Sequence, residues 1–122
     1  MSTMRILLLE NETLAPLFPK MLAHYGFNAV VDYTSNMREA LQWYNERAPY
    51  DVILAGFFDA NGISLAAHIR RTNPTQVIGI MTAFAGEEPI SRVHDLSIPV
   101  LRKPFLTHEL VEFINQLKDR SR

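Results

Sequence analysis

Short apolar runs and segments with helical spacing alternate along the chain. Apolar runs of strand length occupy positions 6–9, 29–31, 52–54, 77–81 and 98–101, and such short runs favour buried β-strands. Between them, apolar residues recur three or four positions apart over 14–25, 37–44, 65–69 and 110–117, as on the buried face of an amphipathic helix. A thinner stripe between Gly86 and Leu96 predicts one further helix, in which Pro89 fits only the first turn.

Five strands that alternate with five helices predict a three-layer α/β domain with a mostly parallel sheet. Ser35 and Thr107 are the expected N-caps of the second and the last helix. Pro16 and Pro19 require the first helix to begin near Leu14 or later. Ligands of such folds bind beyond the carboxyl ends of the strands, so any site is expected there.

Composition narrows the classes of function. The chain has 122 residues, 12 of them basic and 13 acidic, which favours one domain and argues against nucleic-acid or polybasic membrane binding. The chain has no cysteine, which excludes disulfides and thiolate metal sites. The apolar run before Glu10 is too short for a signal peptide or a spanning helix. We therefore expect a cytoplasmic domain, on which basic clusters such as Arg70-Arg71 form solvated surface.

Polar residues follow four of the five expected strands. They are Glu10, Asn11 and Glu12 after the first strand, Tyr33 and Thr34 after the second, Thr82 after the fourth and Lys103 after the fifth. Two acids, a hydroxyl and a lysine at one crevice are typical of an oxyanion or phosphate site. Polar strand ends also occur simply because loops are polar, and the residues alone leave both interpretations open. The third strand ends in Gly56, which has no side chain.

Four stretches in order carry a resemblance to a known family. They are "ILLLENE", "NGISLAAHIRR", "VIGIMTA" and "VLRKPFLTHELVEFINQL". Together they resemble the CheY-like receiver domains of two-component response regulators, along essentially the whole chain. The resemblance implies a flavodoxin-like (βα)5 sandwich with strand order 2-1-3-4-5 and a cis peptide bond before Pro104. It also implies a signalling domain rather than an enzyme.

Receiver domains accept a phosphoryl group on an aspartate at the end of the third strand, and the resemblance places that position on Gly56. Acids after the first strand hold Mg²⁺ in the family, and Glu10 and Asn11 stand at those places. Lys103 and Thr82 match the family's phosphoryl-binding lysine and hydroxyl. The departures imply a degenerate receiver, or pseudo-receiver, that works without phosphorylation and without a cofactor.

Other departures and alternatives concern the same site. Val100 stands where the family has an aromatic reporter, and Glu10 with Glu12 makes a weak metal site at best.

Asp59 is a fallback phosphoacceptor, in which case the domain would be a working Mg²⁺-dependent phosphorelay switch. Lys103 is expected either to pair with Glu10 or Asp59, or to line an empty, hydrated pocket. A third alternative is a sensor that binds a small anion through Lys103 and Thr82.

A protein partner is expected, such as a sensor kinase or a downstream effector. The resemblance places the contact surface on the fourth helix, fifth strand and fifth helix, a face that could also form a homodimer. This surface comprises Ile90, Val93, Val100, Arg102 and Val111. Phe57 and Phe58 are a second candidate contact. We expect no output domain after Arg122, so the signal is expected to pass through this surface unless the chain is part of a longer protein.

Overall fold

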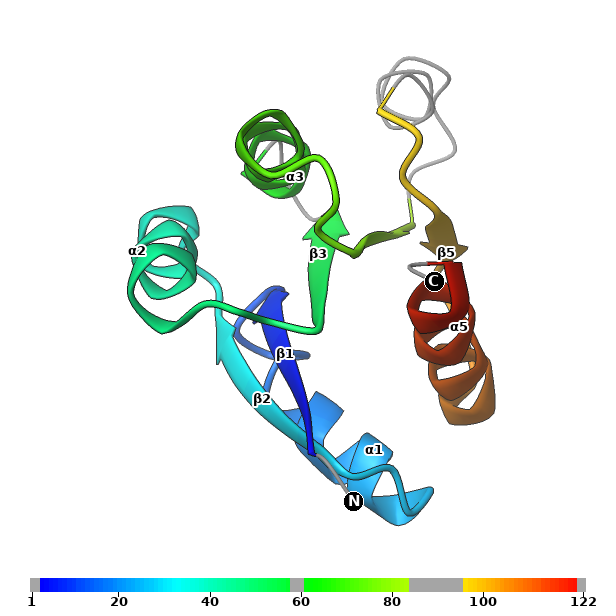
Figure 1. Cartoon of the computed structure of the whole chain (residues 1–122). Coiled ribbons are helices and arrows are strands. Elements are labelled where there is room, and N and C mark those ends of the chain that lie inside the picture. Colours follow the sequence, from blue (N-terminus) through cyan, green and yellow to red (C-terminus); the bar gives the residue numbers. More distant parts are fainter. Residues whose placement is uncertain (1–2, 58–60, 84–95, 121–122) are drawn as a thin grey trace.

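The computed structural model describes residues 3–57, 61–83 and 96–120 (Figure 1). Within them, the strands are β1 (Met4–Leu9), β2 (Ala29–Thr34), β3 (Val52–Phe57), β4 (Ile78–Thr82) and β5 (Val100–Arg102). The helices are α1 (Leu17–His24), α2 (Met37–Arg47), α3 (Asn61–Thr72) and α5 (Thr107–Arg120). The helix predicted between Gly86 and Leu96 falls almost wholly on residues 84–95, outside the described part.

All neighbouring strands pair in parallel, in the order β2-β1-β3-β4-β5. This order confirms the predicted strand order 2-1-3-4-5. Helices α2 and α3 pack on one face of the sheet, and α1 and α5 pack on the other (Figure 1). The carboxyl ends of β1, β3, β4 and β5 consequently lie along one edge.

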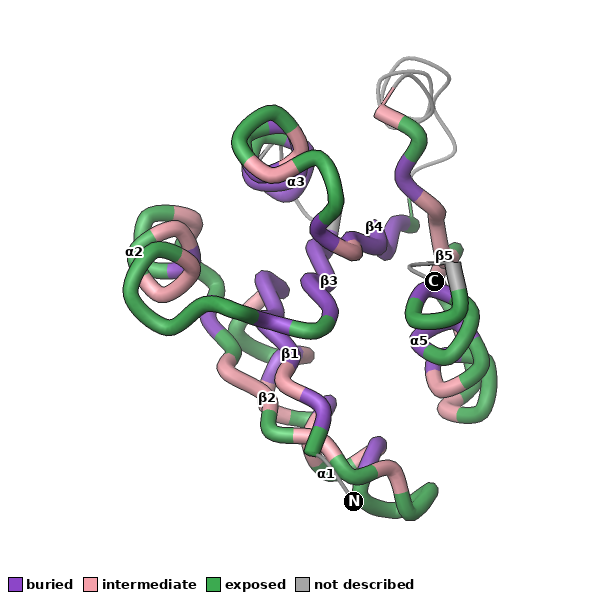
Figure 2. Tube along the Cα trace, in the orientation of Figure 1, coloured by how far each residue is buried: buried purple, intermediate pink, exposed green. Residues whose placement is uncertain are grey.

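The central strands are buried on both faces. Along β1, Leu7 and Leu9 join the core under α2 and α3, whereas Ile6 and Leu8 join the core under α1 and α5. All four side chains are 0% exposed. Because these strands are buried on both faces of the sheet, their sequences are continuous apolar runs rather than alternations of apolar and polar residues. Figure 2 shows the buried strands β1, β3 and β4 inside, with the exposed residues on the outer sides of the helices.

Helix ends differ from the predictions by one to three residues. The N-cap of α2 is Asn36, because its Oδ1 accepts a hydrogen bond from the Glu39 N–H at 3.1 Å. The prediction of Ser35 was wrong by one position. Thr107 is the first residue of α5 rather than the residue before it, and the Glu109 carboxylate accepts the Leu106 N–H at 2.8 Å.

The first helix begins at Leu17, after a turn that contains Pro16, in line with the limit set by the prolines. At its other end, the N–H of Gly26 donates to Ala23 and that of Phe27 donates to Leu22, both at 2.9 Å. This Schellman motif requires the left-handed backbone that Gly26 adopts at φ 70°.

Strand bounds also shift slightly. β2 and β3 each run three residues further than their apolar runs, to Thr34 and Phe57, because the hydrogen-bonded ladder continues into polar or small residues. β5 begins at Val100, two residues later than the run predicted. The predicted cis bond between Lys103 and Pro104 is confirmed. Among the described residues, no helix is long and apolar enough to span a membrane.

A polar cluster fixes the amino end of the sheet. The Tyr50 hydroxyl donates a 2.6 Å hydrogen bond to Asp32, which also pairs with Arg47 at 3.5 Å. The Arg5 guanidinium lies over the Tyr50 ring, 4.8 Å from its centroid. Burial, with a smaller contribution from the hydrogen bond to Asp32, raises the pKa of Tyr50 to about 12. The cluster therefore keeps this phenol protonated.

Candidate functional site

The sheet brings four of the predicted site residues together. Leu9 of β1 pairs with Ala55 of β3, so the next residues along each strand, Glu10 and Gly56, are neighbours. On the other side of β3, Phe57 pairs with Thr82. The Lys103 N–H donates to the Thr82 carbonyl at 2.8 Å, which extends the β4–β5 pairing by one residue.

The Glu10 carboxylate is the centre of the site. The side chain is 0% exposed, and its Oε1 forms an ion pair with Lys103 Nζ. Its Oε2 accepts the backbone N–H of Asn11 at 2.8 Å. The Lys103 side chain is 15% exposed. The structure thus shows the pair with Glu10, one of the two partners considered for Lys103; Asp59, the other partner, lies outside the described residues.

Gly56 is glycine because the Glu10 carboxylate lies directly against its backbone. A Cβ atom added at Gly56 would lie 2.6 Å from Glu10 Cδ and 2.8 Å from Oε1, well inside ordinary carbon contact distances. Glu10 reaches this position because its side chain is one methylene longer than aspartate. The carboxylate of Glu10 therefore occupies the space beside Gly56 at the end of the third strand.

The residues after the first strand do not fit the magnesium ion that the resemblance to receiver domains implies. Both Glu10 oxygens already accept hydrogen bonds. The Asn11 Oδ1 caps the following turn, where it accepts the N–H groups of Thr13 at 3.1 Å and Leu14 at 2.9 Å. Glu12 is exposed. Among the residues that the structure describes, no cluster of three acidic or histidine side chains could hold a metal ion.

Burial distinguishes the predicted residues that the structure describes. Thr82 of the site is buried at 3% exposure, whereas Arg102, predicted for the contact surface, is exposed. Val100 packs against the core under α2 and α3, whereas Val111 packs against the core under α1 and α5. Asp59, Phe58, Ile90 and Val93 lie outside the described residues, and for Phe57 only the backbone is described. Most of the predicted contact surface therefore stays a prediction.

An apolar pocket of about 480 Å³ adjoins the site and was missed from the sequence. Its lining residues come from α1, from the turn before it and from the loops after β4 and β5: Leu14, Leu17, Phe18, Met21, Ala83, Lys103, Pro104 and Phe105. The helical stripe at positions 14–21 was assigned to the core. The 45% exposure of Leu17 shows that part of this stripe faces solvent instead.

Solved structures share this fold. No protein-family model matches the chain, and no curated protein does. A CheY-like response regulator receiver domain protein from Methanospirillum hungatei superimposes with a TM-score of 0.85 at 20% identity, covering 98% of this chain and 97% of that one. A signal receiver domain of an HD domain-containing protein from Pseudomonas fluorescens gives a TM-score of 0.85 at 18% identity, covering 98% of each chain.

A response regulator receiver domain from Francisella gives a TM-score of 0.77 at 25% identity, covering 99% of this chain and 100% of the other. Each superposition spans nearly the whole described sheet and its helices. The chain therefore has the fold of the CheY-like receiver domains of response regulators.

Proposed function

We propose that this chain is a receiver-like domain of two-component signalling that acts by protein–protein contact, without aspartyl phosphorylation. One observation carries the proposal. The Glu10 carboxylate fills the space beside Gly56, where the resemblance to receiver domains implies a phosphoacceptor aspartate, and it pairs with Lys103. An internal carboxylate thus takes the place of the group that would be phosphorylated.

Burial and hydrogen bonding argue against Glu10 as a substitute acceptor. A carboxylate nucleophile must meet the phosphodonor in line, with a metal ion to neutralise the transferring charge. Glu10 is 0% exposed and both its oxygens are engaged. Freeing it would leave Lys103 without its buried partner, which costs on the order of 3–5 kcal/mol. The pair therefore favours one fixed arrangement of the site.

The same pair argues against the small-anion sensor. An anion at the site would have to compete with Glu10, which is already desolvated and in contact with Lys103. Displacing it would strand a buried negative charge. Binding of a free anion at Lys103 is therefore disfavoured relative to the internal ion pair.

Contact with a sensor kinase or a downstream effector is the route that we propose for a signal. The exposed residues at β5 and the start of α5 support this part of the proposal. Arg102 is exposed, and Leu106 is an apolar side chain at 63% exposure. An exposed arginine and an exposed apolar side chain four positions further along the chain are residue types suited to a partner surface. The same face is a candidate for contact between two copies of the chain.

Intact-protein mass after incubation with acetyl phosphate and Mg²⁺ tests the proposal. A receiver domain with an aspartate acceptor serves as the positive control, and an Asp59→Asn variant is treated in parallel. We expect no phosphoryl adduct on the wild-type chain. An adduct that disappears in Asp59→Asn would refute the proposal and identify Asp59 as the acceptor. An adduct that persists in the variant would refute it as well, and peptide mapping would then test Glu10.

A further inference from the structure

Strand β2 forms one edge of the sheet, and among the described strands it pairs only with β1 (Figure 1). It has six residues, whereas β5 at the other edge has three. Proteins commonly protect a sheet edge by keeping its strand short or by placing lysine, proline or a bulge on it. The stretch 29–34 contains no lysine, proline or glycine, and its pairing with β1 runs without interruption. This edge therefore carries none of these protections.

The backbone groups of every second residue of β2 point away from the sheet. The Asn28 and Thr34 carbonyls accept N–H groups at the start of β1 and just beyond its end, both at 3.1 Å. Because the direction of these groups alternates along a strand, the N–H and C=O groups of Ala29, Val31 and Tyr33 point outward. Within the part of the chain that the structure describes, these outward groups have no hydrogen-bond partner.

Exposed apolar side chains accompany the edge on both faces of the sheet. Val30 is 54% exposed and Tyr33 is 41% exposed, and their odd spacing places them on opposite faces. The one charged residue of the strand, Asp32, is held by the Tyr50 hydroxyl and by Arg47, so its carboxylate does not guard the edge. A long edge strand with apolar side chains is a template for pairing with another strand.

We propose that β2 pairs with β2 of a second copy of this chain, in an antiparallel dimer with two-fold symmetry. The outward residues are spaced evenly about Val31, so a two-fold axis beside Val31 places it opposite its own copy and Ala29 opposite Tyr33. Directly opposed outward residues exchange both of their N–H···O bonds. Every outward donor and acceptor of the three residues then has a partner, as an interface that uses one patch twice requires.

The side chains fit the same arrangement. The exposed Tyr33 ring would lie opposite the small Ala29 of the second copy and diagonally beside its Val31, and cross-strand pairs of an aromatic with a β-branched residue stabilise sheets. The paired edge is remote from β5, which lies at the other end of the strand order. The dimer would leave Arg102 and the start of α5 accessible, so it goes beyond the proposed signalling role and does not depend on it.

Sedimentation equilibrium of the whole chain over a range of concentrations tests the proposal, and we expect a dimer that dissociates on dilution. Tyr33→Pro removes an outward N–H but none of the bonds to β1, and it should raise the dissociation constant of the dimer at least about tenfold. Tyr33→Thr removes the ring but keeps the N–H, and it should weaken the dimer less. A wild-type chain that stays monomeric up to about 1 mM, or equal weakening by both substitutions, would overturn the proposal.

Single cysteines test the register independently, because the chain has no cysteine of its own. Val31→Cys places two thiols beside the two-fold axis, with Cα atoms about 5.5 Å apart, within reach of a disulfide. Tyr33→Cys is the matched control on the same face. Its position is more exposed than Val31 in the single chain, but in the dimer its two copies would lie at least about 13 Å apart.

We expect mild oxidation to link Val31→Cys into a covalent dimer and to leave Tyr33→Cys largely unlinked. Linkage of Tyr33→Cys as fast as Val31→Cys would show random collision or another register, and would overturn the proposal. A dimer in which Val31→Cys stays unlinked would use another face, such as that of β5 and α5, and would overturn it as well.

Discussion

Replacing Gly56 by alanine tests the packing of the Glu10 carboxylate against the third strand. The new Cβ would lie 2.6 Å from Glu10 Cδ and 2.8 Å from Oε1. Glu10 is not free to move aside, because Lys103 and the Asn11 N–H hold its two oxygens. Overpacking of this kind costs roughly 1–3 kcal/mol, and we expect a loss of about 2 kcal/mol in the free energy of unfolding.

The decisive comparison repeats this substitution in a Glu10→Asp background. Aspartate is one methylene shorter, so its carboxylate withdraws from the added methyl group. We expect Gly56→Ala to cost less than about 0.5 kcal/mol there, a coupling of about 1.5 kcal/mol in the double-mutant cycle. Urea unfolding measures each term as a change in midpoint at constant slope.

Gly79→Ala is the matched control for this cycle. Its Cβ would lie 2.6 Å from Phe113 Cε2 and 2.7 Å from Leu117 Cδ1, so it also overpacks the core, but without touching Glu10. We expect its cost to be the same in the wild-type and Glu10→Asp backgrounds. If Gly56→Ala behaves like this control and costs as much with aspartate at position 10 as with glutamate, the contact between Glu10 and Gly56 does not cause the destabilisation.

Three further predictions concern a cap, a buried phenol and the ion pair. Asn36→Ala should lower the free energy of unfolding by about 1 kcal/mol, measured in urea, through loss of the N-cap, whereas Ser35→Ala should change it little. A larger loss in Ser35→Ala than in Asn36→Ala would instead support Ser35 as the N-cap. Because the folded pKa of Tyr50 is about 12 and lies above its ordinary value of 10.0, its contribution to stability is complete below pH 10 and is lost as the pH rises toward 12. This loss, of roughly 2–3 kcal/mol, should be absent in Tyr50→Phe, and an equal pH dependence in both proteins would refute the assignment. Lys103→Met should destabilise the chain by about 3 kcal/mol, because it leaves a buried carboxylate without its cation, whereas Lys20→Met at an exposed position should have little effect; equal effects would show that the pair is unimportant.

The sheet could be predicted from the sequence because each central strand is buried on both faces. Continuous apolar runs such as Ile6–Leu9 then stand out against the helical stripes. The ends of the strands were harder to place. Thr34 and Phe57 extend their strands through backbone pairing, a feature that hydrophobic patterning does not report.

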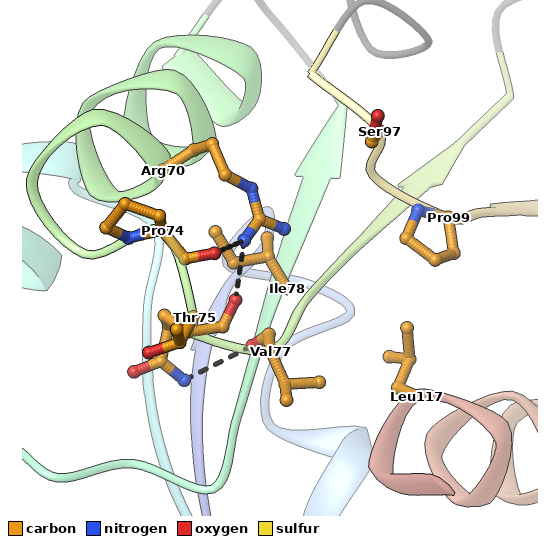
Figure 3. A pocket seen from close by; sticks show the side chains of 9 residues that line it. Arg70, Pro74, Thr75, Val77, Ile78, Ser97, Pro99 and Leu117 are labelled. Carbon is orange, nitrogen blue, oxygen red and sulfur yellow. Dashed lines mark hydrogen bonds between the residues drawn. The ribbon is translucent and has the colours of Figure 1, made fainter. Parts of the chain in front are cut away.

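Hydrogen bonds of single side chains explain why the predicted helix ends were wrong. Ser35 and Asn36 are both good capping residues, and only the bond from Glu39 to the Asn36 side chain separates them. In the basic cluster interpreted as solvated surface, Arg71 is exposed and Arg70 is partly exposed. The Arg70 guanidinium is held by carbonyls of the loop between α3 and β4 (Figure 3), and sequence spacing does not encode such a contact.

The contact between Glu10 and Gly56 could be recognised only once the strand register was known. The sequence separately indicated a lengthened acid after the first strand and a glycine after the third. It did not show that the two positions are adjacent, with the carboxylate against the glycine backbone. A glutamate after one strand, together with a glycine at the end of the neighbouring strand, is a pair of residues that could be searched for in a sequence.

The response of the amide NMR spectrum to acetyl phosphate and Mg²⁺ distinguishes the proposed pseudo-receiver from a phosphorylated receiver. We expect the amides of Gly56, Thr82 and Lys103 to keep their chemical shifts, because under the proposed function the Glu10 carboxylate occupies the place of the acceptor. Shifts of these three amides that appear with the phosphodonor and revert as it is consumed would refute the pseudo-receiver proposal. They would show a working phosphorylation switch at the carboxyl edge of the sheet.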